Sequence, residues 1–363
     1  MPLPVPDTAE RSDKAAVAAL PPLAAWLDEL SSGFERAADG VGVAELRLRV
    51  AGLPVLVRFA GPQLSEQLGP AFDHLRADPG EEPALTIYAW DSEQSGTPPP
   101  PLPTIDRSDP RGTTFYVADE GRRLASRPLL GQLSAYDSDR RAGWFWCRSG
   151  RELPFWERAA PFRQVLHWWL PEHGKLLVHG AAVGHASHGL LLAGRGGSGK
   201  STCALATLTS PLLYAGDDYV AVDVGSEPRI FSLYCSGKLV PSHARLLPHL
   251  PTPTFAGDGS LEEKSVFYVA ERFPERMCGG FPLAAVVAPR VHGSAPEFTR
   301  VGPAEALAAL APSTLLQLVP AQADALTAMA GVLQRVPAYR FDVGGPVELL
   351  PEALDRLLAE VQR

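Results

Sequence analysis

The sequence predicts an α/β fold built around a phosphate-binding loop, with an α+β domain in front of it. From Leu176 onward, short apolar runs alternate with glycines and helix-like segments, which is the pattern of an α/β core. One of these runs leads directly into a glycine-rich loop and a helix. Residues 21–150 instead carry the period-two alternation of half-exposed strands. A chain of 363 residues is long enough for two such domains.

Composition and charge exclude several classes of protein. Hydrophobic residues make up 45% and charged residues 20% of the chain, as in ordinary soluble domains. A formal net charge of −8 without a basic stripe argues against a nucleic-acid partner. No segment has the ~18 uninterrupted apolar residues of a membrane helix, and the start lacks the apolar block of a signal peptide. We therefore expect no membrane partner and a cytoplasmic location. The cysteines lie far apart, as expected for reduced thiols: Cys147, Cys203, Cys235 and Cys278.

The first 150 residues are expected to hold a flexible N-terminus (1–20) and an α+β accessory domain (21–150) that recognises the substrate. The clearest element is a β-hairpin, in which Ala51-Gly52 separates two alternating runs. The expected strands are 44–50, 53–59, 84–90, 113–118 and 141–148, the expected helices are 23–30 and 62–75, and a proline-rich spacer covers 96–103.

Residues 151–175 are predicted to link the two domains through a helix. Residues 155–170 have helical apolar spacing and contain three tryptophans. A helix that lies on a lipid surface has this composition too. Burial between two domains suits the tryptophans better, because their large rings gain most from leaving water.

Residues 176–363 are predicted to form the phosphate-loop domain. Its expected strands are 176–179, 190–193, 212–215, 220–224, 229–233 and 284–288. Helices are expected after the loop and at 303–311, 313–318, 323–335 and 351–361.

The glycine-rich loop is the most specific motif of the chain. Residues 190–202 read Leu-Leu-Leu-Ala-Gly-Arg-Gly-Gly-Ser-Gly-Lys-Ser-Thr and match GxxxxGK[ST] at every fixed position. Glycines let consecutive N–H groups face one anion, and the following helix adds its positive end. Lys200 is expected to reach the β- and γ-phosphates, and Ser201 to ligate Mg²⁺. The predicted nucleotide-binding residues are Gly194, Arg195, Gly196, Gly197, Ser198, Gly199, Lys200, Ser201 and Thr202.

A pair of carboxylates follows the next predicted strand, in Gly216-Asp217-Asp218-Tyr219. Beside a phosphate loop, one carboxylate can hold magnesium and the other can accept a proton from an attacking hydroxyl. The alternative is a polar turn without chemistry, which this composition also favours. Because the glycine-rich loop lies upstream, we favour a functional site over a polar turn.

Lysine is scarce, with five lysines among 33 basic residues. Where arginine is used almost everywhere, a lysine indicates a need for a compact ammonium group. Lys238 and Lys264 are therefore candidates for neutralising the transferred phosphoryl group. Lys264 has the alternative of an exposed charged turn with Glu262-Glu263. The general alternative for a lysine of this chain is chance retention on a solvated surface.

Three segments resemble the HPr kinase/phosphorylase family: His179-Gly-Ala-Ala-Val, the loop 192–202, and Gly216-Asp-Asp-Tyr-Val. The chain is most similar to the HPr-kinase-like proteins of gene clusters that modify ribosomally made peptides, including lasso-peptide kinases. The likeness covers about residues 170–363 and implies a mixed α/β phosphate-loop domain, similar to phosphoenolpyruvate carboxykinase.

The resemblance also implies roles for single residues. His179 matches a histidine near the γ-phosphate, Asp217 the proton acceptor, and Asp218 a carboxylate near magnesium. His179 has the alternative of simply closing a strand. The chain departs from the family at Thr202, where a glutamate is usual, and in lacking the third motif. In place of that motif stands Ser232-Leu-Tyr-Cys-Ser-Gly-Lys238.

The function expected from the sequence is an ATP- and Mg²⁺-dependent kinase acting on a hydroxyl. The acceptor implied by the resemblance is a serine of a peptide or protein, such as a ribosomally made precursor peptide. A kinase for a small hydroxylated metabolite uses the same chemistry. A nucleotide-gated ATPase or switch needs no base for an acceptor alcohol, so the paired aspartates favour transfer. Since relatives are often hexameric, a homo-oligomer is a further expectation.

Overall fold

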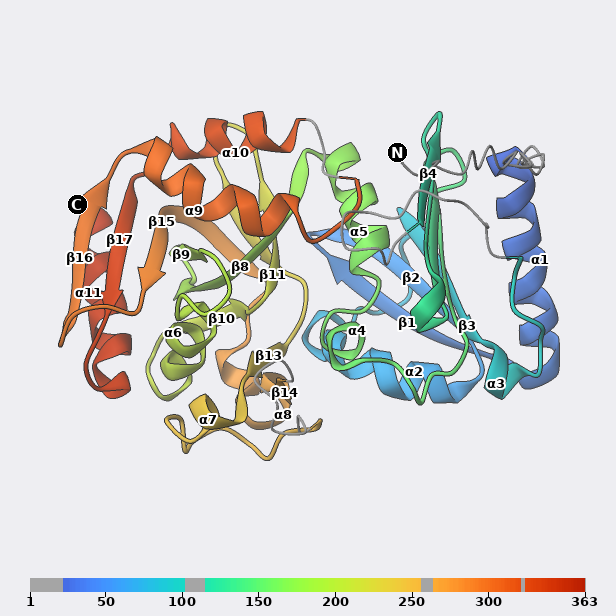
Figure 1. Ribbon diagram of the computed structural model, residues 1–363, viewed down its shortest axis with the longest axis horizontal. Helices are drawn as coiled ribbons and strands as arrows, with labels where there is room; N and C mark the ends of the chain where they lie inside the picture. Colours follow the sequence, from blue (N-terminus) through green and yellow to red (C-terminus); the bar gives the residue numbers. More distant parts are fainter. Residues whose placement is uncertain (1–21, 102–114, 256–263, 321–323, 363) are drawn as a thin grey trace, which may run out of the picture.

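The computed structural model describes residues 22–101, 115–255, 264–320 and 324–362. The expected flexible terminus 1–20, the end of the proline-rich spacer and Glu262-Glu263 lie outside these residues. The described chain is a mixed α/β protein with one seven-stranded, one eight-stranded and one two-stranded sheet. Figure 1 shows the two large sheets side by side, one in each half of the molecule.

The first sheet has the strand order β1-β2-β3-β7-β6-β5-β4. The predicted hairpin is confirmed, since β1 pairs antiparallel with β2 around Ala51 (φ 50°) and Gly52 (φ 83°). Such a two-residue turn needs positive φ at both positions. β5 and β6 were not predicted, because their polar, Arg- and Ser-containing runs carry little β-branched signal. The strands are β1 Val43–Val50, β2 Leu53–Ala60, β3 Leu85–Asp91, β4 Phe115–Asp119, β5 Arg122–Arg127, β6 Gln132–Asp137 and β7 Ala142–Cys147.

Helices cover both faces of this sheet. On one face lies α1 (Leu23–Val41), which packs Phe34 against Trp90. It is longer than predicted, because its apolar spacing continues to Ala38. The predicted helix 62–75 is α2 (Pro62–Leu68) followed by a tighter 3-10 turn, η1 (Gly69–Leu75), which begins at Gly69-Pro70. The short elements are α3 Ser92–Ser95 and η2 Pro128–Leu130.

The predicted linking helix 155–170 is broken in the structure. It consists of α4 (Phe155–Ala159) and α5 (Arg163–Trp169), continued by η3 (Leu170–His173). The residue before a proline avoids helical angles, and Ala160 precedes Pro161 with φ −140° and ψ 70°. Phe162 then turns the chain with a positive φ of 57°. Every residue of α5 is buried, so its tryptophans face protein, as predicted, and not a lipid surface.

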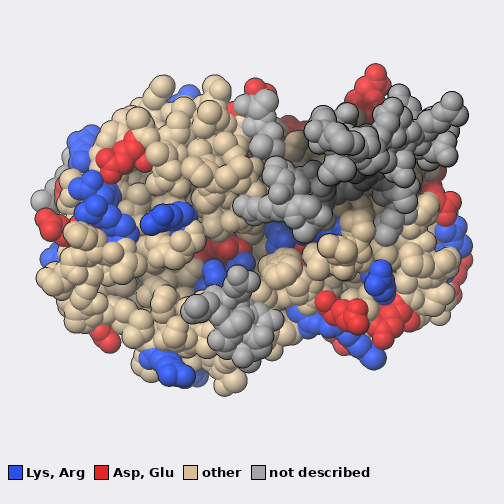
Figure 2. Space-filling model, in the orientation of Figure 1, with Lys and Arg blue, Asp and Glu red and all other residues tan. Residues whose placement is uncertain are grey.

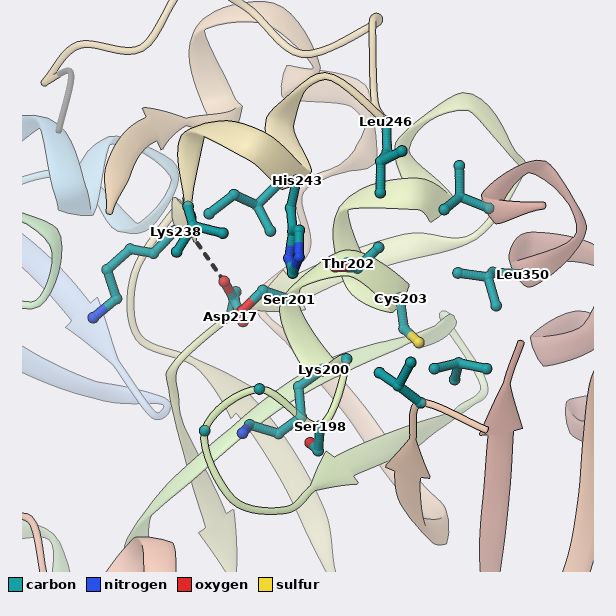
Figure 3. A pocket seen from close by; sticks show the side chains of 18 of the residues that line it. Ser198, Lys200, Ser201, Thr202, Cys203, Asp217, Lys238, His243, Leu246 and Leu350 are labelled. Atoms are coloured by element: carbon teal, nitrogen blue, oxygen red, sulfur yellow. Dashed lines mark hydrogen bonds between the residues drawn. The ribbon is translucent and has the colours of Figure 1, made fainter. Parts of the chain in front are cut away.

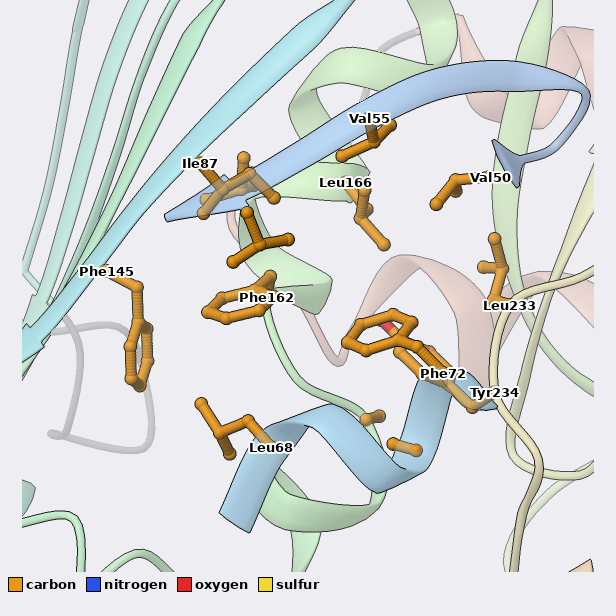
Figure 4. Close-up of a cluster of buried hydrophobic side chains, with 14 of the residues drawn as sticks. Val50, Val55, Leu68, Phe72, Ile87, Phe145, Phe162, Leu166, Leu233 and Tyr234 are labelled. Atoms are coloured by element: carbon orange, nitrogen blue, oxygen red, sulfur yellow. The ribbon is translucent and has the colours of Figure 1, made fainter. Parts of the chain in front are cut away.

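Phe162 lies at the centre of a core that joins the two halves (Figure 4). Its ring centroid lies 6.1 Å from those of Phe59 and Phe72 and 5.5 Å from that of Phe145. The core continues from Phe72 to Tyr234, 5.3 Å away. Each large apolar side chain that is buried in this core stabilises the folded state by about 1.5–3 kcal/mol. The two halves of the chain therefore share one continuous core.

The second sheet has the order β10-β8-β11-β12-β15-β17-β16, with β9 paired to β8 and β15. Most pairs are antiparallel, but β9 and β17 run parallel to β15. β13 and β14 form the two-stranded sheet. β13, β14, β16 and β17 were not predicted. The strands are β8 Lys175–His185, β9 His188–Ala193, β10 Leu213–Gly216, β11 Tyr219–Asp223, β12 Arg229–Ser232, β13 Ser236–Leu239, β14 Ser265–Tyr268, β15 Gly280–Arg290, β16 Pro296–Val301 and β17 Ala338–Val343.

Helices sandwich this sheet as well (Figure 1). α6 (Lys200–Ala206) and α11 (Leu350–Val361) pack on one face, and α9 (Pro303–Leu315) and α10 (Ala325–Leu333) on the other. The two helices predicted at 303–318 form one helix that keeps Pro312 inside. In the described chain, no helix combines the length and the hydropathy required to cross a bilayer. The short elements are η4 Thr207–Thr209, α7 Pro241–Ala244, α8 Val269–Arg272, η5 Pro274–Arg276 and η6 Val347–Leu349.

The three parallel strands end at the same edge of the sheet. β9 runs into the glycine loop, β15 into Val291-His292-Gly293, and β17 into Gly344-Gly345. In sheets with parallel strands, ligands bind outside the carboxyl ends. This edge is therefore where the fold places a site.

Candidate active site

The glycine loop joins β9 to α6 and is closed by its own lysine. Nζ of Lys200 donates to the carbonyl oxygens of Gly194 (2.6 Å) and Arg195 (3.2 Å). Gly197 (φ 78°) and Gly199 (φ 104°) adopt left-handed angles that favour glycine. Burial lowers the pKa of Lys200, although the two nearby aspartates oppose that shift. The loop thus holds a buried ammonium group at its centre.

The predicted acidic pair forms a tight turn between β10 and β11. Asp218 has a φ of 76°, an angle that few residues other than glycine adopt and that aspartate tolerates better than most. Strained backbone of this kind is often found at functional sites. The turn directs the two carboxylates to different partners. Oδ2 of Asp217 accepts from the backbone N–H of Lys238 (3.1 Å), whereas Asp218 contacts the side chains of His179 and Lys238.

The surroundings of the two carboxylates push their pKa values apart. Burial raises the pKa of Asp217, and the negative charge of Asp218 raises it further. Burial also opposes ionisation of Asp218, but Lys238 and His179 outweigh it and hold the pKa of Asp218 well below the usual range. Paired groups with separated pKa values are a common basis for acid–base roles.

Ser201 lies beside the carboxyl group of Asp217. The Oδ1 atom of Asp217 is buried and has no hydrogen-bond partner among the described residues. The Ser201 hydroxyl lowers the pKa of this carboxyl group, against the larger effect of burial. Figure 3 shows Ser201 directly beside Asp217. A buried acceptor without a partner is costly unless a ligand satisfies it.

Lys238 is the main cationic partner of the acidic turn. Its Nζ forms an ion pair with Oδ2 of Asp218, whose Oδ1 lies 3.2 Å from Nε2 of His179. Burial lowers the pKa of Lys238, and Asp218 counteracts that shift. The ring of Phe155 lies 5.9 Å from the same ammonium group. The half-buried Lys264 lines the same cavity.

One cavity of about 650 Å³ connects these groups. Three of the five lysines of the chain line it: Lys200, Lys238 and Lys264. Figure 3 shows Lys238 and Asp217 at one end and Leu246 and Leu350 at the other. Valine side chains also line the cavity, and Figure 2 shows acidic and basic surfaces meeting near the middle of this face. Mixed apolar and polar lining of this size suits a small-molecule ligand.

Most residues expected at the site share this cavity. It is lined by His179, Gly196, Gly197, Ser198, Gly199, Lys200, Ser201, Thr202, Asp217, Asp218 and Lys238. Gly194 and Arg195 are not among the lining residues. Arg195 is exposed, and both contribute carbonyl oxygens to Lys200.

The cavity also contains residues that the sequence analysis missed. His243 and Leu246 come from α7 and the residues after it, and Val291, His292 and Val343 come from the ends of β15 and β17. Because β17 was not predicted, the loop after it was not visible as a site. A glycine pair directly after an apolar run, Gly344-Gly345, is the signal that was available.

The residues are better suited to a magnesium ion that also binds phosphates than to a metal ion held by protein side chains alone. Among the described residues, no group of three or more His, Cys, Asp or Glu side chains could hold a metal. Mg²⁺ is bound through one or two protein oxygens together with phosphates and water. The Ser201 hydroxyl and the carboxylates of the aspartate pair, which all line the cavity, supply such oxygens.

The fold and the cavity define a mixed α/β protein in which a glycine loop faces an acidic turn. No protein-family model and no curated protein matches the chain. Among solved structures, the chain is similar to one described as the Hpr(Ser) kinase/phosphatase from Coxiella burnetii, at 10% identity and a TM-score of 0.27. The alignment covers 51% of this chain and 95% of that one. A likeness at this TM-score carries no weight for reaction or substrate, and the resemblance to peptide-cluster kinases stays a prediction.

Proposed function

We propose that this chain is a phosphotransferase that moves the γ-phosphoryl group of ATP onto a hydroxyl, with magnesium as cofactor. The observation that carries the proposal is the meeting of Lys200 and Ser201 with Asp217, Asp218 and Lys238 in one cavity. A nucleotide-gated switch needs one carboxylate to hold magnesium, but it needs no second carboxylate to act as a base for an acceptor hydroxyl. The serine of a peptide or protein is the acceptor that the sequence resemblance implies.

The glycine loop is the proposed binding site for the phosphates. The N–H groups of residues 196–201 and the start of α6 offer donors and positive potential to an anion. A phosphate would take over the contacts that Lys200 now makes with the carbonyl oxygens of Gly194 and Arg195. The apolar end of the cavity, which includes Val343 and Leu350, then faces the base and sugar.

When bound, magnesium would supply positive charge against the negative charge that develops on the phosphate oxygens during transfer. Ser201 and Asp218 are the residues proposed to hold it. The low pKa of Asp218 keeps its carboxylate ionised, although burial alone would favour the neutral form. His179 and Lys238 fix the orientation of that carboxylate.

Asp217 is the proposed proton acceptor. Burial raises its pKa, and a base works best when its pKa approaches the working pH. As Asp217 takes the proton, the acceptor oxygen forms a bond to the γ-phosphorus and the bond to the β–γ bridging oxygen breaks. ADP and the phosphorylated acceptor result. Lys238 and Lys264 supply positive charge near the transferred group.

The proposal is tested by incubating the full chain with Mg²⁺, γ-labelled ATP and separate pools of peptides and small hydroxylated metabolites. Label on a peptide serine is the expected result. Label on a metabolite alone identifies a metabolite kinase, and free phosphate alone identifies an ATPase. A chain that neither binds nor turns over ATP contradicts the proposal. Lys200→Ala serves as the negative control.

A further inference from the structure

The C-terminal end of α4 is capped by hydroxyl groups from β14 and from the segment that carries Lys238. Carbonyl groups at a helix end lack partners within the helix and must be satisfied by other donors. Tyr268 donates to the carbonyl of Arg158 (3.3 Å), and Ser236 donates to that of Ala159. Tyr234 donates to the carbonyl of Pro161 (2.9 Å). Residues 158–161 thus form a row of acceptors for three hydroxyl groups.

The same segment is attached to η1 in the first half of the chain. The backbone N–H of Cys235 donates to the carbonyl of Ala71 (2.8 Å). Nε2 of His74 lies 2.6 Å from Oγ of Ser232. Two separate elements of the N-terminal part, α4 and η1, therefore hold the chain just before Lys238.

On its other side, β13 packs against the helix that follows the glycine loop. A Cβ atom on Gly237 would lie 2.6 Å from Cδ2 of Leu205 in α6, so a larger residue at this position would displace the Leu205 side chain. β13 therefore packs between α4 and α6. Its position relative to the glycine loop is set from both sides.

We propose that α4 and η1 position the reactive centre, with Tyr234 and Ser236 as positioning residues that act through Lys238. This inference rests on the proposed function. Lys238 contacts both carboxylates: its N–H bonds to Asp217 and its Nζ to Asp218. A shift of β13 therefore displaces the partners of both aspartates, while the hydrogen bonds of Lys200 within the glycine loop involve no residue of β13. The N-terminal half contributes to turnover through this attachment.

The test uses the full chain and a double variant, Tyr234→Phe with Ser236→Ala, which removes two hydroxyl groups and little volume. Tyr136→Phe is the matched control, because it removes a hydroxyl that bonds to Glu172 (2.6 Å) outside the cavity. The measurements are binding of a fluorescent ATP analogue with Mg²⁺, transfer of label from γ-labelled ATP to the pools of peptides and small hydroxylated metabolites, and hydrogen exchange. Exchange is compared between peptides covering residues 234–240 and residues 200–206.

The double variant is expected to lose about tenfold in turnover while its nucleotide affinity stays within about twofold, since small misplacements of catalytic groups cost rate. Exchange should rise in residues 234–240 and not in 200–206. Unchanged turnover, or turnover and affinity falling together with faster exchange throughout, overturns the inference. If the wild-type chain transfers no phosphoryl group, the proposed function fails. Hydrogen exchange in residues 234–240 of the double variant then decides alone whether the hydroxyl groups of Tyr234 and Ser236 hold β13 in place.

Discussion

Nε2 of His179 lies 3.2 Å from Oδ1 of Asp218, at the point where the long strand β8 changes partners. Up to His179, β8 pairs with β11, and beyond it β8 pairs with β9 and β10. The N–H of Gly180 also donates to the carbonyl of Asp218 (3.0 Å). The strand that neighbours the start of the glycine loop therefore holds the acidic turn as well. This shared strand fixes the two motifs relative to each other.

Lys200→Ala should weaken binding of Mg²⁺-ATP by about 10- to 100-fold, the usual loss when one charged hydrogen-bond donor is removed. Isothermal titration with ATP measures the effect. Lys175→Ala is the matched control, because Lys175 bonds to the carbonyl of His173 away from the cavity. Equal loss in both variants would show that general charge, and not the loop lysine, attracts the nucleotide.

Asp217→Asn should keep nucleotide affinity and lose transfer by about 100-fold or more, since a general base contributes 10²–10⁴-fold. The amide keeps the shape of the side chain but accepts no proton. Labelled-phosphate transfer and nucleotide binding are measured on the same preparation. Asp223→Asn, at the end of β11 and outside the cavity lining, is the control. Full transfer by Asp217→Asn refutes its role as the base.

Lys238→Met should lower the free energy of unfolding by about 3 kcal/mol, because it leaves the ionised Asp218 without its cationic partner in a largely buried site. Adding Asp218→Asn should restore most of that loss, since the unpaired charge is then gone. Urea unfolding at neutral pH measures both variants and the single Asp218→Asn change. Purely additive effects would show that the two side chains do not interact energetically.

His74 should make the fold sensitive to acid. Burial lowers the pKa of His74 to about 4 from 6.5, so the folded state keeps it neutral. A depressed folded pKa gives stability that is present above pH 6.5 and is lost as pH falls towards 4, because the unfolded chain takes up the proton first. The loss amounts to about 3 kcal/mol across that window.

The measurement for His74 is the urea-unfolding free energy between pH 7 and pH 4. His74→Gln should flatten the pH dependence relative to the wild type, while His292→Gln, at an exposed position, should leave it unchanged. A wild-type curve that is flat over this range, or one that the His74 change does not alter, would contradict the expected shift.

Local sequence determined the parts of the molecule whose conformation depends on near neighbours. The Ala51-Gly52 hairpin, the glycine loop with Lys200, and the turn at Asp217-Asp218 are readable because glycine freedom, turn chemistry and apolar runs act over a few residues. Other elements carried weak local signals. β5, β6 and β13 are short and polar, and the helix predicted at 155–170 breaks because Pro161 excludes a helical residue before it.

Only the tertiary structure decided which distant residues share the site. His179, Lys200, Asp218, Lys238 and Lys264 converge because β8, α6, the β10–β11 turn and the β13–β14 pair meet at one edge of the second sheet. No local pattern encodes that meeting, since it follows from strand order and from a core that Phe162 and Tyr234 extend across both halves. Periodicity reports which face of a segment is buried, but the partner that buries it is chosen by long-range packing.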